Sequence, residues 1–208
     1  MAFLETTARL RAPARLRARL LALFTVVAIL VALAGAVTSA AAMTFRTETL
    51  PDGTRIVRGD GPVVEGDAER LRAALQSADR NASGHKVLAL DSPGGLVIES
   101  FAMVEVMDRE RAATRVRPGA RCASACAQIL FLSGAHRTIE PGGRIGLHTC
   151  HTAGDRRRSM ACNELIAQNA LARGTPYGAV MAFLHFTAPT EIRWLDAREA
   201  ELWGFTRR

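Results

Sequence analysis

A short apolar run, Val87–Leu90, is followed at once by the sharp turn Asp91–Gly95 and then by a long apolar segment that reaches Arg111. A strand without alternating polar residues is buried on both faces, as in a parallel sheet that helices cover. The segment after the turn is apolar on most of its surface and predicts a buried helix. This strand–turn–helix order limits the chain to an α/β fold built from βαβ units.

The rest of the chain after residue 42 continues this alternation. Further strands are predicted within residues 54–64 and at 114–117, 137–139 and 144–149. Helices are predicted from Asp67, over 123–133, over 159–173 before Gly174, and from Asp196, where a capping box begins a short last helix. We expect one domain over residues 43–208 with a mostly parallel sheet.

The first 42 residues read as a targeting segment. Arginines up to Arg19 precede an apolar run at 20–37, and small residues follow at 38–42. This is the order of a secretory signal, yet a run of 18 residues also nearly spans a bilayer. Residues 1–42 are therefore either a cleaved signal peptide or an N-terminal membrane anchor. Both place the domain outside the cytoplasm, in the periplasm or an equivalent compartment.

The positive charge does not predict a nucleic-acid partner. The formal net charge is +7, but five arginines and only one glutamate lie in residues 1–42. The remaining domain carries a weak excess and no basic stripe interleaved with aromatic residues. Contact with a membrane is expected only through the N-terminal segment, if that segment is not cleaved.

Four cysteines, an even number, lie in the predicted exported domain: Cys122, Cys126, Cys150 and Cys162. In an oxidising compartment they predict two disulfides. The sequence leaves all three pairings open.

Three segments carry residues suited to acyl-transfer chemistry. The turn Ser92–Gly95 can point backbone N–H groups at a ligand. Ser124 lies among small residues between a strand and a helix, and His148 lies at the end of a strand. A histidine close to a serine can take its proton and make it a nucleophile.

Together, and in this order, these segments resemble the ClpP/crotonase-like superfamily. Leu90–Gly95 is similar to its strand and oxyanion turn, Cys122–Cys126 to its nucleophile loop, and Ile145–His148 to its histidine strand. Val57–Val63 and Trp194–Gly204 resemble its first strands and its last capped helix. The resemblance implies a spiral of βαβ units and, given the targeting segment, an exported relative of the Clp protease proteolytic subunit.

The resemblance also implies roles for single residues. Ser124 would be the nucleophile and His148 the general base, and the N–H groups of Gly95 and Ala125 would form the oxyanion hole.

This chain departs from the family's pattern at the acid that orients the histidine, because Ile192 falls near the expected position of that acid. Glu191 and Asp196 are the nearby candidates for a third acid. The site is therefore either a Ser-His dyad or a triad.

The function that the resemblance implies is an ATP-independent serine hydrolase, a peptidase for short or unfolded peptides, without a cofactor and assembled as a homo-oligomer. A non-catalytic binding module on the same fold is the main alternative. A crotonase-type acyl-CoA enzyme is less expected, because acyl-CoA is a cytoplasmic substrate.

Two other chemistries are disfavoured by the residues themselves. A Ser-Lys dyad lacks a suitable base, since Lys86 is the only lysine and matches no family position. His148, Cys150, His151 and Cys162 offer zinc-binding atoms, but their spacing is irregular and the compartment favours disulfides. We expect no metal.

Export is directly testable. Alkaline phosphatase fused to the C-terminus should be active, because that enzyme folds only where its disulfides form. Its activity in intact cells is the measurement. A stable but inactive fusion would refute the predicted location.

Overall fold

The computed structural model describes residues 42–151 and 157–208. The predicted signal peptide or anchor, residues 1–42, lies outside the described residues apart from its last residue. Within the described ranges, no helix combines the length and apolar character that a membrane crossing requires.

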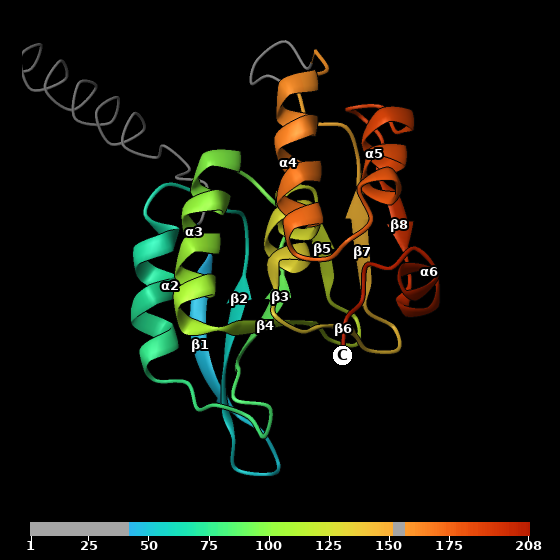
Figure 1. The fold of residues 1–208 in the computed structure, drawn as a ribbon. Helices are drawn as coiled ribbons and strands as arrows, with labels where there is room; N and C mark the ends of the chain where they lie inside the picture. The colour runs from blue at the N-terminus through green and yellow to red at the C-terminus, as the bar shows by residue number, and fades with distance from the viewer. Residues whose placement is uncertain (1–41, 152–156) are drawn as a thin grey trace, which may run out of the picture. The chain divides into compact units, whose positions relative to one another are not determined.

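The central element is a sheet of five strands: β1 (Thr44–Thr49), β2 (Arg55–Asp60), β3 (Lys86–Asp91), β4 (Ala112–Val116) and β6 (Arg137–Ile139). They lie in the order β1-β2-β3-β4-β6, and every pair is parallel except the edge pair β1–β2. The expected α/β class with a mostly parallel sheet is confirmed (Figure 1).

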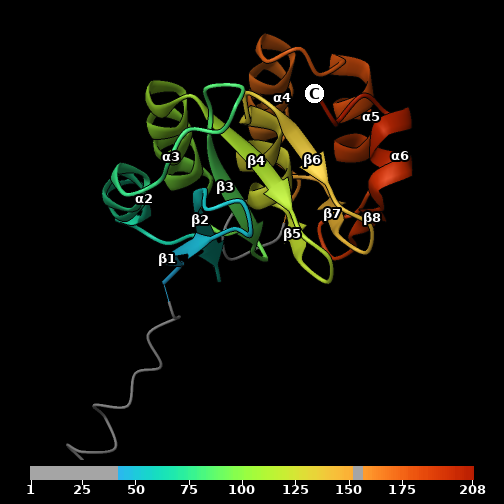
Figure 2. The ribbon, with the colours of Figure 1, turned by 90° about the horizontal axis from the view of Figure 1, so that it is seen from below.

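Two helices pack side by side against one face of this sheet, α2 (Asp67–Gln76) and α3 (Val97–Glu110) (Figure 2). The main core between them and the sheet includes Leu71, Leu75, Leu88, Leu90, Met103 and Met107. Successive strand residues point to opposite faces, so Val87 and Ala89 form a smaller cluster with Ile56 on the other face. This explains why the β3 sequence is apolar throughout.

A second, smaller sheet holds the other half of the site. It consists of β5 (Arg121–Ala123), β7 (Arg144–Leu147) and β8 (Arg193–Leu195), in that order. β5 and β7 are parallel, whereas β7 and β8 are antiparallel. A parallel bridge from Ser92 to Cys122 links the end of β3 to this sheet.

The remaining helices pack around the second sheet. A π-helix, Cys126–Leu130, and a 3₁₀ turn, Phe131–Ser133, follow β5 and are completely buried. The others are α4 (Met160–Ala172), α5 (Tyr177–Phe186) and α6 (Ala197–Leu202). The predicted capping box of Asp196 and Glu199 is present at the start of α6 and is confirmed.

The structure corrects the predicted elements in two places. The helix predicted from Ala123 begins only after Ser124, because Ala123 belongs to β5 and pairs with Gly146. Strands β1, β5 and β8 were not predicted, since their sequences show no apolar run bounded by turns. Pairing with β2 holds β1 in place, and pairing with β7 holds β5 and β8.

Candidate active site

Backbone hydrogen bonds bring the three chemistry-bearing segments to one place. The Ser92 N–H donates to Arg121 O at 2.8 Å, and the Ala123 N–H donates to Ser92 O at 2.9 Å. On the other side of β5, the Ser124 N–H donates to Gly146 O at 2.9 Å. The glycine turn, Ser124 and the histidine strand are therefore neighbours in the fold.

Ser124 lies in a left-handed backbone turn between β5 and the π-helix. Its φ angle is 54°, and only one other non-glycine residue among the described residues, Arg111, has a positive φ. This conformation costs a residue with a side chain about 1–2 kcal/mol, so the surrounding structure must hold it there. Ser124 is partly exposed, whereas its neighbours Ala123 and Ala125 are buried. The turn therefore presents the serine side chain to solvent.

The glycine turn packs directly against Ser124. A Cβ atom on Gly94 would lie 2.8 Å from Ser124 Cβ and 2.8 Å from the Ala125 nitrogen, and one on Gly95 would lie 2.1 Å from Val63 O. Both glycines also have positive φ angles, 90° and 152°. Only glycine fits either position.

Two N–H groups at this junction are free to receive a negative charge. The Gly94 N–H donates to the Ser92 hydroxyl, and Val63 bonds to the carbonyl of Gly94 and the N–H of Leu96. The N–H groups of Gly95 and Ala125 have no acceptor among the described residues. Uncommitted donors of this kind beside a serine are one requirement of an oxyanion hole.

His148 directly follows β7 and is 7% exposed. Burial lowers the pKa of His148 below its ordinary value of 6.5, and nearby His151, at 6.0 Å between ring centroids, lowers that pKa further. A weaker contact with the Thr149 backbone opposes these two effects. The imidazole is therefore neutral at pH 7, the state in which it can accept a proton.

No hydrogen bond joins the Ser124 hydroxyl to His148 in the part of the chain that the structure describes. The two residues are connected through Gln128, which sequence reasoning missed. The Gln128 N–H donates to Ser124 O at 2.9 Å, and its side-chain Nε2 donates to His148 O at 2.7 Å. The only sequence signal for this link was a glutamine four positions, or about one helical turn, after the serine.

Asn163 of α4, also missed from sequence, fixes the residues that follow His148. Its Oδ1 accepts from the Cys150 N–H at 2.7 Å, and its Nδ2 donates to Thr149 Oγ1 at 2.9 Å. Asn163 is fully buried. Together with Gln128 it holds the backbone of residues 148–150 in a defined position.

Neither candidate acid reaches the histidine. Nδ1 of His148 is buried and has no hydrogen-bond partner among residues 42–151 and 157–208. Glu191 is exposed, and the Asp196 carboxylate accepts from the Glu199 N–H as the cap of α6. Ile192 instead packs over Gly146 of β7, where an added Cβ atom would lie 2.5 Å from Ile192 Cγ2.

The cysteines form the bridges Cys122–Cys126 and Cys150–Cys162. One bridge therefore encloses Ser124, and the other begins two residues after His148. Bonded cysteines cannot ligate zinc as thiolates, and the described residues contain no group of three or more metal-binding side chains.

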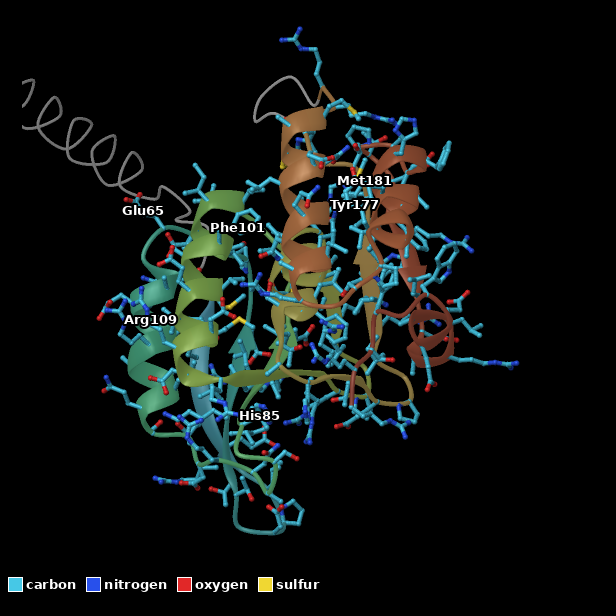
Figure 3. All side chains as sticks on the ribbon, in the orientation of Figure 1. Glu65, His85, Phe101, Arg109, Tyr177 and Met181 are labelled. Atoms are coloured by element: carbon cyan, nitrogen blue, oxygen red, sulfur yellow. A yellow bond between two sulfur atoms is a disulfide. The ribbon has the colours of Figure 1, made fainter. Side chains whose placement is uncertain are left out.

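A cleft of about 620 Å³ opens beside the glycine turn. Its lining is Glu65, Gly95, Leu96, Val97, Ile98, Glu99 and His151. Leu96 and Ile98 are 53% and 86% exposed, which is unusual for large apolar side chains next to a polar site. Glu65 is labelled in Figure 3, at the end of the domain where α3 begins. An extended ligand with an apolar side chain fits this lining.

Comparison with known proteins found neither a matching protein-family model nor a matching curated protein.

The two bridges predict the chemical state and the stability of the protein. Full-length protein taken from its native compartment should react with iodoacetamide only after reduction, because all four cysteines are bonded. From the loop lengths, the bridges contribute about 2 and about 3 kcal/mol to the free energy of unfolding. Mass spectrometry after alkylation is the first measurement, and four alkylated thiols without reductant would contradict the pairing. Chemical unfolding with and without reductant is the second.

Proposed function

We propose that this chain is an exported, ATP-independent serine hydrolase with a ClpP/crotonase-like fold, which cleaves short or unfolded peptides. The observation that carries the proposal is the left-handed turn at Ser124. It holds the partly exposed Ser124 at the junction where the N–H groups of Gly95 and Ala125 are unused. Backbone strain, partial exposure and free donors coincide at this turn, and strained residues of this kind cluster at functional sites.

The arrangement of strands supports the proposed fold family. Two consecutive βαβ units, β2-α2-β3 and β3-α3-β4, build a parallel sheet, and the chain then passes to a second sheet that carries the serine and the histidine. Each of the three segments that carry the resemblance directly follows a strand. The glycine turn follows β3, the serine follows β5, and the histidine follows β7.

The mechanism assigned to these residues is acyl transfer. His148 takes the proton of the Ser124 hydroxyl as the oxygen bonds to the scissile carbonyl carbon. The N–H groups of Gly95 and Ala125 stabilise the carbonyl oxygen, which becomes negative. His148 then passes the proton to the leaving amine as the C–N bond breaks. A water molecule attacks the acyl-enzyme in the same way, and Ser124 regains its proton.

The proposed enzyme works as a dyad, because Nδ1 of His148 has no carboxylate partner among the described residues. An orienting acid fixes the tautomer of the imidazole and stabilises its charged form, and its loss can cost about 10⁴ in turnover. We therefore expect a low turnover rate. The side chains of Gln128 and Asn163 bond to the backbone of His148 and Cys150, and so provide part of the positioning of the histidine that an acid would supply.

The cleft supports a peptide substrate with an apolar side chain next to the scissile bond, since Leu96, Val97 and Ile98 line it beside Gly95. The two disulfides support an oxidising compartment. No ATP is expected there, so the substrate would be short or already unfolded.

A non-catalytic binding module is the second candidate, and the unpartnered His148 Nδ1 favours it. Such a module would use the same cleft for peptide recognition without turnover. Covalent labelling separates the two proposals.

A fluorophosphonate should label the full-length chain at Ser124, because the reagent reports a hydroxyl activated by a base. Ser124→Ala should abolish labelling, and His148→Ala should slow it at least about 100-fold, the contribution of a general base. Ser83→Ala and His185→Ala, which change an exposed serine and an exposed histidine, are the matched controls. Labelling that persists in Ser124→Ala would refute the mechanism, and a folded chain that is never labelled would favour the binding module.

The pH dependence of labelling should report the buried histidine. Protonated His148 cannot accept the serine proton, so the rate should fall as the pH drops through its pKa, with a midpoint below 6.5. His151→Gln should raise the midpoint, because the charge of His151 disfavours protonation of His148. The measurement is the labelling rate between about pH 4.5 and 8.5, a range that brackets the histidine pKa. A midpoint above 6.5 would contradict this account of the site.

A further inference from the structure

A second cavity, of about 380 Å³, lies at the other end of the parallel strands. It is lined by residues before β3, at the ends of α3 and α4, and before β6, including His85, Asp108, Arg111, His136, Arg173 and Arg207. In Figure 3, His85 lies at the lower end of the domain, whereas Glu65 of the cleft lies near the upper end. The cavity is therefore separate from the candidate active site.

The lining carries more positive than negative charge. Asp108 is its only carboxylate, and the Arg173 guanidinium pairs with it at 2.5 Å. Arg111 has no ion pair or hydrogen-bonding partner for its side chain among the described residues, and the side chain of Arg207 donates only to the carbonyl of Arg173, at 3.3 Å. Neither of these two guanidinium groups has a carboxylate partner among the described residues.

The carbonyl ends of α3 and α4 do not supply the missing negative charge. Helix C-termini carry a partial negative charge, but other arginines already bond the carbonyls there. Arg80 donates to Glu110 O at 3.1 Å, and both Arg137 and Arg207 donate to Arg173 O, at 3.0 and 3.3 Å. Arg111 is left to face the cavity.

Two histidines add donors that can become charged. The rings of His85 and His136 lie 4.3 Å apart between centroids. His85 is only 8% exposed, and its Nδ1 has no hydrogen-bond partner within the described residues. Burial, and then the charges of His136, Arg111 and Arg80, lower the pKa of His85. An anion in the cavity would offset the repulsion between these groups.

The backbone at Arg111 is also unusual. Arg111 follows α3 with a φ of 52°, a position where glycine is favoured because it has no Cβ. Apart from Ser124, it is the only described non-glycine residue with a positive φ. A strained arginine where glycine would be more stable points to a use for its side chain.

We propose that this cavity binds a doubly charged oxyanion of the phosphate or sulfate class, held by Arg111 and Arg207 with His85 and His136 beside it. The charge of the ligand matches the two guanidinium groups without a carboxylate partner among the described residues, and planar guanidinium donors suit tetrahedral oxyanions. A metal ion would meet repulsion from three arginines, and the described residues hold no group of three metal-binding side chains here. The proposal is independent of the hydrolase activity.

The test is a calorimetric titration of the full-length chain with sodium sulfate at constant ionic strength. Arg111→Gly should weaken binding at least about tenfold, the effect of losing one charge-assisted hydrogen bond. This variant should fold normally, because glycine accepts the left-handed conformation without strain. Arg207→Gln should also weaken binding. The control is Arg109→Gln, which removes the same charge at a position two residues before Arg111. The Arg109 side chain pairs with Glu105 and does not line the cavity.

The same titration with inorganic phosphate, phenyl phosphate and acetate identifies the ligand. Binding of phosphate but not of phenyl phosphate would assign a free oxyanion, and binding of both would assign a phosphate ester. Acetate should bind at least tenfold more weakly, since it carries one charge. Three results would overturn the proposal: no heat with any oxyanion, equal loss of affinity in Arg109→Gln and Arg111→Gly, or acetate binding as tightly as sulfate.

Discussion

The close approach of the glycine turn to Ser124 is the constraint on which the candidate site depends. No side chain fits at Gly94, since its Cβ would meet Ala123 O at 2.6 Å as well as Ser124 Cβ. This contact allows the end of β3 to lie against the turn after β5, although Ser124 is 29 positions beyond Gly95 in the sequence. Once these segments touch, the Gly95 and Ala125 N–H groups lie at the same junction. The parallel pairing of β5 with β7 then adds the histidine.

Hydrogen bonds and a disulfide hold the backbone of His148 and its neighbours, whereas close packing against Gly94 helps to hold Ser124. The ring of His148 has no partner at Nδ1 among the described residues, so its position derives from its backbone. Gln128 bonds to its carbonyl, Asn163 holds the next two residues, and the bridge Cys150–Cys162 ties the same segment to α4. These contacts fix where the ring is attached, but they do not choose which ring nitrogen carries the proton. A site built in this way favours proton transfer less strongly than one with an orienting acid.

Local signals in the sequence predicted local structure well. The apolar run of β3, the turn at Gly94 and the capping box of Asp196 were all found, because each depends on residues that are close in the chain. The three-residue strands β5 and β8 were not, since they depend on pairing with segments that are distant in the sequence. The same limit applied to the site. The sequence marked Ser124 and His148 through a family resemblance. The packing of Ile192 over Gly146 depends on the β7–β8 pairing, however, and the disulfide pairing depends on tertiary packing.

Ser124 and Arg111 both adopt the left-handed backbone conformation, and different contacts stabilise it at opposite ends of the parallel strands. Each costs about 1–2 kcal/mol, a substantial part of the 5–15 kcal/mol by which a domain is typically stable. At Ser124 the turn is fixed on three sides, by the bridge Cys122–Cys126, by Gly94 and by the bond to Gly146 O. At Arg111 the turn is fixed by the end of α3 and the immediate start of β4 at Ala112, which leave no room for a longer connection. Glycine would relieve the strain at either position but would remove the side chain that each turn presents. The strain is therefore best explained by the side chains themselves, a hydroxyl at one end of the strands and a guanidinium at the other.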